Sequence, residues 1–242
     1  MRLAIFSAFP QEIRRVVKEI KAVRSPEGPF PLFFGKYSSN EIIVALTGMG
    51  GRNAETAFGC VLKAYTPDLA LSIGFGGALY DGAEIGEIVW GSRLFLVREG
   101  IAEPLELSHS GDVLRRLPTT LAMREGAIFT LEGLTKKSRI KKILPADLPF
   151  PVSDMETFYL AKLAAKTGLP FSALRSITDR ADEEIPPEFL AVSDESGQYR
   201  LSRALGLLFK PRLLKDIAKI GRNSFIASNN LWHAVRSIIE GL

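Results

Sequence analysis

The chain has 242 residues, 46% of them hydrophobic, which predicts one large α/β domain with a good core rather than two small domains. Its single cysteine, Cys60, excludes an internal disulfide framework and favours a reducing compartment, and with only two histidines the chain cannot build a His/Cys zinc site. The formal net charge is +4, but the residues from Arg200 onward carry +6 and the first 199 carry −2. The basic character therefore belongs to the C-terminal part.

The N-terminal stretch Leu3–Ala8 is short and apolar, as expected of a buried β-strand. A helix is predicted from Pro10 to Ile20, with Glu12 in its first turn and so at the C-terminal edge of that strand. The stretch does not read as a signal peptide, because it has one basic residue, no small-residue cleavage pattern and a polar helix start behind it. No apolar run reaches the ~18 residues of a membrane span, and we expect a soluble cytoplasmic protein.

The next segments predict a hairpin and a glycine-rich turn. Leu32–Ser38 and Ile42–Leu46 have strand character around a short polar connection. Thr47–Asn53 is rich in glycine and leads into a predicted helix at Ala54–Tyr65. The dinucleotide-binding fingerprint fails here, because Asn53 stands where its third glycine belongs. The glycines either let the backbone approach a ligand closely or make a tight turn.

A buried strand is predicted at Leu69–Ile73, and Gly74–Gly77 follows it as a turn. Small residues at the end of a central strand leave room for a flat ligand, although they are also ordinary turn residues. Further along, the sequence predicts strands at Gly86–Val97 and Gly126–Phe129, with a short helix at Ser110–Arg116 between them.

The stretch Leu134–Leu144 is basic and is interpreted as a solvated face. A helix is predicted at Met155–Thr167, ended by Gly168, and a buried strand at Phe171–Ile177. This alternation of strands and helices predicts a three-layer α/β/α fold with a central mixed, twisted sheet, spanning residues 1–190. Residues 191–242 are expected to form a C-terminal helical extension packed on or beside that domain.

Two carboxylates make the first hypothesis for a functional site. Asp179 ends the strand before it, and Glu156 begins the helix before that strand, so one helix–strand unit brings them together. The carboxyl ends of parallel strands are where open α/β sheets carry their chemistry, and Glu12 lies at the same edge if the strands run parallel. The simpler alternative is that Asp179 caps a loop, Glu156 caps a helix, and Glu12 complements a helix dipole.

Four motifs together resemble the purine nucleoside phosphorylase/5′-methylthioadenosine nucleosidase superfamily. They are Glu12 in SAFPQE, the Gly74–Gly77 turn, DME at Asp154–Glu156, and RSITDRAD at Arg175–Asp182. The resemblance extends from Arg2 to about Asp182. Within the superfamily the chain looks most like the hopanoid-associated branch, implicated in cleaving adenosylhopane, because of SDMET, GLPFSALRSITDRADEEIPP and the C-terminal FKPRLLKDIAKIGRNSFIA.

The resemblance implies cleavage of a purine N-glycosidic bond through an oxocarbenium-like state. Asp179 would be the general acid at N7 of the purine, with a pKa raised by burial. Glu156 would bind the ribose hydroxyls, Met155 would pack on the sugar, and Arg175 would reach the same pocket and orient a carboxylate. The rest of the expected substrate contacts are Phe9, Met49, Phe75, Gly76 and Gly77.

Glu12 bears on whether water or phosphate is the nucleophile. In the hydrolases of the superfamily the matching glutamate activates water, whereas the phosphorylases hold phosphate with glycine and arginine. The sequence keeps Glu12, which favours hydrolysis, although Arg52 and Arg93 could bind an anion and phosphate stays possible as a co-substrate. No other cofactor and no metal are expected.

The chain departs from the hydrolases at Leu131–Thr135, LEGLT, where those enzymes carry an aromatic–aliphatic pair around adenine. Phe75, Phe129 or Phe150 would have to take that place, so the base is left open. The expected substrate is adenosylhopane or a similar 5′-substituted adenosine; the alternatives are methylthioadenosine, S-adenosylhomocysteine or futalosine, and, in another class, a nucleoside- or nucleic-acid-binding protein without turnover. Nucleic acid is not favoured, because the tail lacks interleaved aromatic residues.

The basic tail alternates apolar and cationic residues near helical spacing. It fits a helix packed on the domain, half of a dimer interface, or a basic amphipathic helix on an anionic membrane surface. The family suggests a homodimer, and a lipid-linked substrate would favour peripheral contact with the inner membrane face. The residues with this spacing are Leu207, Leu208, Lys210, Arg212, Leu213, Leu214, Lys215, Ile217, Lys219, Ile220 and Arg222.

Overall fold

The computed structural model describes residues 1–25, 28–105, 123–133, 135–184, 188 and 213–242. The expected helix at Ser110–Arg116, His109 and the tail up to Arg212 lie outside the described residues. The strands are β1 (Arg2–Ser7), β2 (Val23–Arg24), β3 (Leu32–Tyr37), β4 (Asn40–Leu46), β5 (Leu69–Ala78), β6 (Ile88–Arg98), β7 (Ile101–Leu105), β8 (Met123–Leu131), β9 (Val152–Asp154) and β10 (Phe171–Asp179). The helices are α1 (Pro10–Glu19), α2 (Gly51–Ala64), α4 (Lys137–Ile140, followed by a 3₁₀ turn at Lys141–Ile143), α5 (Thr157–Thr167) and α7 (Leu214–Gly241).

The strands form one mixed sheet in the order β10-β6-β8-β9-β5-β1-β4-β3-β2, with β7 on β6. The parallel pairs β1–β4, β1–β5 and β5–β10 make its centre, and β3–β4 is the predicted hairpin. Because β10 also pairs with β5, the five strands β10, β6, β8, β9 and β5 close a ring at one end of the sheet. The carboxyl ends of β1, β5 and β10 therefore meet at one edge.

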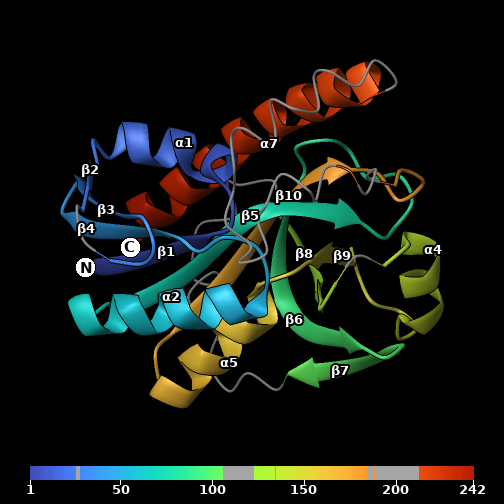
Figure 1. Cartoon of the computed structure of the whole chain (residues 1–242), viewed down its shortest axis with the longest axis horizontal. Helices are drawn as coiled ribbons and strands as arrows, with labels where there is room; N and C mark the ends of the chain where they lie inside the picture. Colours follow the sequence, from blue (N-terminus) through green and yellow to red (C-terminus); the bar gives the residue numbers. More distant parts are fainter. Residues whose placement is uncertain (26–27, 106–122, 134, 185–187, 189–212) are drawn as a thin grey trace.

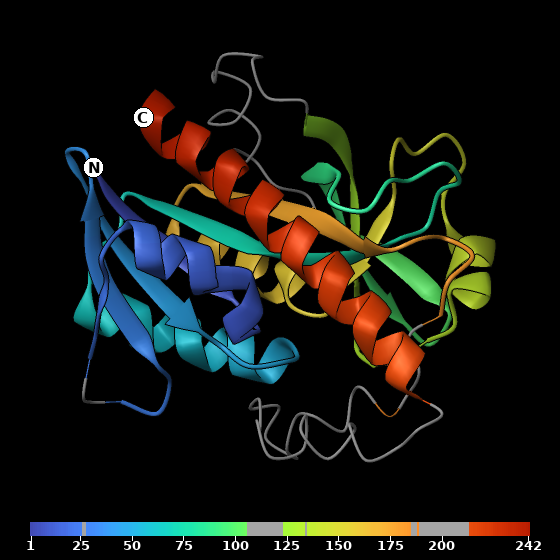
Figure 2. The ribbon, with the colours of Figure 1, turned by 90° about the horizontal axis from the view of Figure 1, so that it is seen from above.

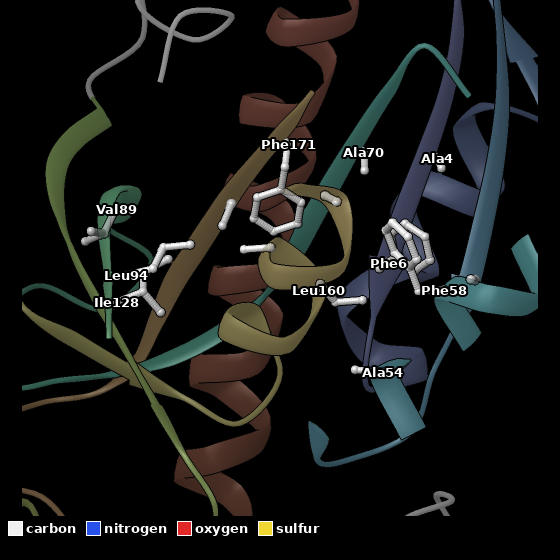
Figure 3. Close-up of a cluster of buried hydrophobic side chains, with 14 of the residues drawn as sticks. Ala4, Phe6, Ala54, Phe58, Ala70, Val89, Leu94, Ile128, Leu160 and Phe171 are labelled. Atoms are coloured by element: carbon white, nitrogen blue, oxygen red, sulfur yellow. The ribbon is translucent and has the colours of Figure 1, made fainter. Parts of the chain in front are cut away.

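Helices cover both faces of the sheet, as predicted. In Figure 1, α1 and α7 lie on one face and α2 and α5 on the other. Alternate residues of β1 point to the two faces: Leu3 and Ile5 pack with α1 and α7, whereas Ala4 and Phe6 pack with α2 and α5. Figure 3 shows the second of these clusters, where the rings of Phe6 and Phe58 stack with their centroids 5.3 Å apart.

α7 is an integral part of the first core. It runs diagonally across the sheet with α1 beside it (Figure 2). Its second half contributes Leu231, Trp232, Val235 and Ile238 to the cluster that holds β1 and α1, all of them buried. Within the described part of the chain, no helix is both long and apolar enough to cross a membrane.

The predicted turn at Gly74–Gly77 is wrong, because β5 continues as a strand through these residues to Ala78. Hydrogen-bonded ladders hold the glycines extended on both sides: Arg175 of β10 pairs with Gly74, and Ser153 of β9 pairs with Gly77. The local preference of glycine for turns is overridden by these two neighbouring strands.

β10 carries an irregularity at its end. Ile177 pairs with Gly76 and Asp179 with Gly77, so Thr178 is an extra residue with no partner on β5. Such a bulge re-aims the next side chain, which here is Asp179. The carbonyl oxygen of Thr178, left out of the β10–β5 ladder, accepts a hydrogen bond from the Nδ2 of Asn223 in α7 at 2.8 Å.

Candidate active site

Glu12 is a buried carboxylate held by four hydrogen-bond donors. Its Oε2 accepts from the hydroxyl of Ser7 (2.5 Å) and from the backbone N–H groups of Ala8 (3.0 Å) and Phe9 (2.9 Å). Its Oε1 accepts from the backbone N–H of Phe75 at 2.8 Å. Burial raises the pKa of Glu12, against the opposing effect of these hydrogen bonds. The first turn of α1 and the middle of β5 thus share one carboxylate.

The absence of a side chain at Gly74 makes this contact possible. A Cβ at that position would lie 2.9 Å from Oε1 of Glu12, closer than van der Waals contact allows. The glycines of β5 therefore leave space for functional groups of neighbouring elements, which is a more specific role than a turn.

Glu156 lies between β9 and α5 and is half-buried, as is Met155 before it. The predicted helix thus begins two residues later than expected, at Thr157, and Glu156 is its N-cap residue. The Oε1 of Glu156 accepts from the backbone N–H of Gly50 at 2.8 Å, which ties it to the glycine turn before α2. Burial first, and the charge of Asp154 second, raise the pKa of Glu156 to about 8. Glu12 contributes to the same rise, so these two carboxyl groups lie within each other's field.

Asp179 ends β10 and forms an ion pair with Lys137 of α4, with side chains only 10% and 8% exposed. Its Oδ1 accepts from the hydroxyl of Thr178 at 2.8 Å. Burial raises the pKa of Asp179, and the Lys137 ammonium opposes this rise. A Cβ on Gly77 would lie 2.7 Å from the Oδ2 of Asp179, so this glycine also makes room for a carboxyl group.

Arg175 does not lie where the sequence predicted it. Its side chain is 2% exposed, beneath the site rather than in it, and pairs with Asp154 through Nη2–Oδ2 at 2.6 Å and Nε–Oδ2 at 3.0 Å. The expectation that it orients a carboxylate fits Asp154. Its other N–H groups donate to protein acceptors, so a direct substrate contact is not what this position supports. Those acceptors are the hydroxyls of Ser72 and Thr157 and the carbonyl oxygens of Ser72 and Leu174.

Asp154 completes this buried network. Its Oδ1 accepts from the hydroxyl of Thr130 at 2.6 Å, and its Oδ2 accepts from the backbone N–H of Thr157 at 3.0 Å as well as from Arg175. The carboxylate is thereby the anchor at the start of α5, immediately before Met155 and Glu156. The network fixes the segment that carries these two residues.

The three phenylalanines considered for stacking on the base differ in burial and in their neighbours. Phe129 is fully buried and stacks on Phe95 with centroids 4.6 Å apart, so it cannot lie against a base. Phe150 is half-buried, and Arg124 lies 4.9 Å over its ring. Phe75 is half-buried on β5, next to Gly76 and Gly77, and its backbone binds Glu12.

Phe9 and Met49 are half-buried at the ends of β1 and β4, the former at the N-cap of α1 and the latter in the turn before α2. Arg52 and Arg93, the candidate anion-binding residues, are exposed. In the part of the chain that the structure describes, no three Asp, Glu, His or Cys side chains gather as a metal-binding group would require.

Two residues of this region were given no role by the sequence. Asp154 stands inside DME, but its partner Arg175 is 21 residues away. Lys137 is one of several cations in the stretch interpreted as solvated; Lys136, Arg139 and Lys142 are indeed exposed, whereas Lys137 is 6% exposed. A signal for Asp154 existed in its place within the motif, but no local signal distinguishes Lys137 from Lys136.

Comparison with known proteins places the chain among nucleoside-cleaving enzymes. The family model described as the Phosphorylase superfamily matches residues 2–206. A 5′-methylthioadenosine/S-adenosylhomocysteine nucleosidase of Shewanella halifaxensis is 22% identical over 86% of this chain and 99% of the relative, and one of Buchnera aphidicola is 20% identical over 87% and 98%. Among solved structures, the Neisseria meningitidis nucleosidase of the same name in complex with methylthio-immucillin-A has a TM-score of 0.74 at 18% identity, covering 100% and 99% of the two chains. A Helicobacter pylori futalosine hydrolase mutant has a TM-score of 0.71 at 17% identity, covering 100% of both.

Proposed function

Because this chain belongs to the phosphorylase superfamily, we propose that it is an enzyme that cleaves the N-glycosidic bond of a purine nucleoside and releases adenine from a 5′-substituted adenosine. The observation that supports this most is the placement of Glu12, Glu156 and Asp179 at one edge of the sheet. Each is buried or half-buried, and each has a raised pKa.

Glycosidic cleavage needs a proton for the departing base, an anchor for the ribose and a positioned nucleophile. We assign the proton to Asp179, whose burial favours the protonated form that a general acid needs. Glu156 is assigned to the ribose hydroxyls, with Met155 against the sugar. Gly76, Gly77 and Phe75 are assigned to the substrate contact. The missing side chain at Gly76 makes room for Arg175, and the one at Gly77 makes room for Asp179 and Lys137.

Water is the nucleophile we propose. Glu12 is held in place by four donors, and a carboxylate whose pKa is raised by burial is better able to take a proton from water. Phosphate would need a cation beside it, and Arg175 does not supply one, because its donors are engaged by protein acceptors. The exposed Arg52 and Arg93 are the remaining candidates, and the phosphate dependence of the reaction tests them. Arg175 is assigned a positioning role through Asp154 rather than a substrate contact.

The 5′ substituent is the finer part of the proposal. Phe9 and Met49 are apolar, half-buried and assigned to the 5′ side, which suits an apolar arm. The resemblance to the hopanoid-associated branch makes adenosylhopane the substrate of first choice. Methylthioadenosine, S-adenosylhomocysteine and futalosine are the alternatives, and these are the substrates that the names of the relatives and structural neighbours carry.

Peripheral contact with an anionic membrane belongs to the same proposal. In α7, Leu214 is 47% and Phe225 69% exposed, and Lys215 is also exposed. Helical spacing places Leu214 and Phe225 on the same side of α7, with Lys215 flanking them, and exposed apolar side chains beside a cation favour the surface of an anionic bilayer. Sedimentation with anionic and neutral vesicles tests this contact, and sedimentation equilibrium tests the proposed homodimer.

The decisive experiment is adenine release from a panel of 5′-substituted adenosines, with and without phosphate. We expect release without phosphate, and a fall of about 10²–10⁴-fold in kcat for Asp179→Asn, because an amide cannot donate the proton. Asp81→Asn is the matched control, since Asp81 is an exposed carboxylate paired with Lys141. Release that depends on phosphate would overturn the assignment of Glu12. No release from any nucleoside would favour a binding protein without turnover.

A further inference from the structure

Lys137 is buried at the sheet edge with all three hydrogens of its ammonium group directed at acceptors. They are the Oδ2 of Asp179, in the ion pair already described, and the backbone carbonyl oxygens of Asp179 (3.3 Å) and Arg180 (2.5 Å). Three acceptors around one Nζ match the three donors of an ammonium group. The lysine therefore contacts both the side chain and the backbone at the end of β10.

The backbone of Lys137 is fixed as well. Its N–H donates to the Oε1 of Glu184 at 3.0 Å, beyond the end of β10. Its Cε would lie 3.1 Å from a Cβ on Gly77, so the aliphatic stem passes over the glycine of β5. Lys137 thus contacts β5, β10 and the loop after β10. A lysine on a solvated face would make no such set of contacts.

We propose that Lys137 is a positioning residue, which fixes the carboxyl group of Asp179 and sets the pH range over which that carboxyl group keeps a proton. The catalytic use of this proton rests on the proposed function. The positioning of Asp179 by Lys137 rests on the ion pair alone. The stretch that the sequence marked as a solvated basic face would then contribute one residue to the chemistry.

Opposing influences act on the Asp179 carboxyl group. Burial favours its neutral form, and the charge of Glu183 in the following loop acts in the same direction. Lys137 favours the ionised form. Glu183 is itself paired with Lys219 of α7 at 2.8 Å, and Glu184 binds the backbone of Lys137, so neither is a free charge beside Asp179. Among the described residues, Lys137 is the cation in direct contact with this carboxyl group.

The sign of the effect follows from these charges. Removing the ammonium group leaves burial and Glu183 opposed by the Thr178 hydrogen bond but no longer by Lys137, so the pKa of Asp179 rises further. If the protonated carboxyl group is the active form, the alkaline limb of the pH profile of kcat/KM moves to higher pH. At the same time the lost contact frees the carboxyl group to turn away from the base, so kcat at the optimum falls.

The test compares Lys137→Met, Lys137→Arg and Lys141→Met, the last removing a lysine of the same stretch that pairs with exposed Asp81. The titration of Asp179 is followed by ¹³C NMR of labelled aspartate carboxyls, with Asp179→Asn assigning the resonance. We expect the midpoint to rise by about 1–2 pH units in Lys137→Met. Lys137→Arg should return it toward the wild-type value, and Lys141→Met should leave it unchanged.

The kinetic arm uses the same variants on a nucleoside that the wild type cleaves. We expect Lys137→Met to lower kcat by about 10-fold or more and to move the alkaline limb upward, with KM changed less than kcat. An unchanged carboxyl midpoint in a folded Lys137→Met variant would overturn the proposal. So would a fall in activity that leaves the pH profile in place, because that is the mark of a structural role.

Two further measurements keep the outcomes separate. The NMR titration needs no turnover, so it tests the pair even if the proposed function fails. If Lys137→Met does not fold, Lys137→Gln provides the second variant, since its amide can still donate to the two carbonyl oxygens. In the Asp179→Asn background, Lys137→Met should change kcat by less than 2-fold; a larger additional loss would show that the lysine acts elsewhere.

Discussion

Two buried salt bridges lie a few residues apart on β10 and differ in what surrounds them. The Arg175–Asp154 pair is 2% and 1% exposed and is closed on all sides by hydroxyl and carbonyl groups of the protein. The Lys137–Asp179 pair is 8% and 10% exposed and lies at the end of the strand, where a bulge re-aims the carboxyl group.

The difference shows that one type of interaction serves two purposes. In the inner pair every polar atom has a fixed partner, and removing one partner leaves a charge in the core. In the outer pair burial and a neighbouring cation act against each other on a carboxyl group that still reaches the surface. We interpret the inner pair as scaffolding and the outer pair as a group poised to exchange a proton.

The largest effect is expected from breaking the inner pair. Arg175→Met keeps the volume of the side chain but leaves Asp154 as an unpaired buried carboxylate, at a cost of about 3–5 kcal/mol in the free energy of unfolding. Urea denaturation measures it. Arg98→Met is the control, because the Arg98–Glu132 pair is exposed and should contribute less than about 1 kcal/mol. Equal losses in the two variants would contradict a scaffolding role for the inner pair.

A smaller effect is expected from displacing the outer pair without removing either charge. Gly77→Ala adds a Cβ 2.7 Å from the Oδ2 of Asp179 and 3.1 Å from the Cε of Lys137, so one of the two side chains must move. We expect kcat to fall by about 10–100-fold through the misplaced acid. Gly59→Ala, in α2, meets nothing within 4 Å and controls for the added methyl group. Full activity of Gly77→Ala would indicate that the position of Asp179 is not limiting.

The smallest effect is expected at Glu156, which follows the inner pair in the chain and whose pKa is raised by burial and, in part, by the charge of Asp154. The pKa of Glu156 is raised from 4.5 to about 8 in the folded state, so between these pH values the folded state binds the proton more tightly than the unfolded state. The stability that this carboxyl group contributes is therefore present below pH 4.5 and lost as pH rises through 8.

Glu156→Gln does not titrate and should therefore gain stability relative to the wild type as pH rises, by ~1–2 kcal/mol at pH 8.5, a value reduced for the partial exposure of the group. Urea unfolding at pH 5 and at pH 8.5 measures the difference. Glu132→Gln is the control: Arg98 holds the pKa of Glu132 below 4.5, so the stability of this group changes only in more acidic solution and the variant should change little between the two pH values. A gain that does not depend on pH would assign the effect to packing instead.

The sequence predicted those parts of the fold that local pattern determines. The apolar run of β1, the hairpin β3–β4 and the helix at Pro10 all lie close to where they were expected, and so does the arrangement in three layers. The adjacency of Glu12 to the end of β1 also followed from the order of strand and helix. The roles given to Glu12, Glu156 and Asp179 stay predictions until activity is measured.

The errors have a common physical cause, which is that the deciding contact is distant in the sequence. Gly74–Gly77 was assigned to a turn because glycine disfavours strands locally, whereas β9 and β10 hold it extended from both sides. Lys137 was assigned to a solvated face, but its partner Asp179 follows 42 residues later. Arg175 was expected near the substrate because the core acceptors around it, Asp154 among them, could not be located by spacing.

The hydrogen bond from Asn223 to the carbonyl of Thr178, the residue without a partner on β5, has a consequence for biosynthesis. The bulge that re-aims Asp179 lies in β10. The donor that binds the Thr178 carbonyl of this bulge, Asn223, belongs to α7, which leaves the ribosome later. A nascent chain that ends after β10 therefore already holds Asp179 against Lys137, but it lacks the donor that Asn223 supplies to the Thr178 carbonyl. The candidate site at the end of β10 therefore has all of its supporting contacts only after α7 has docked on the core.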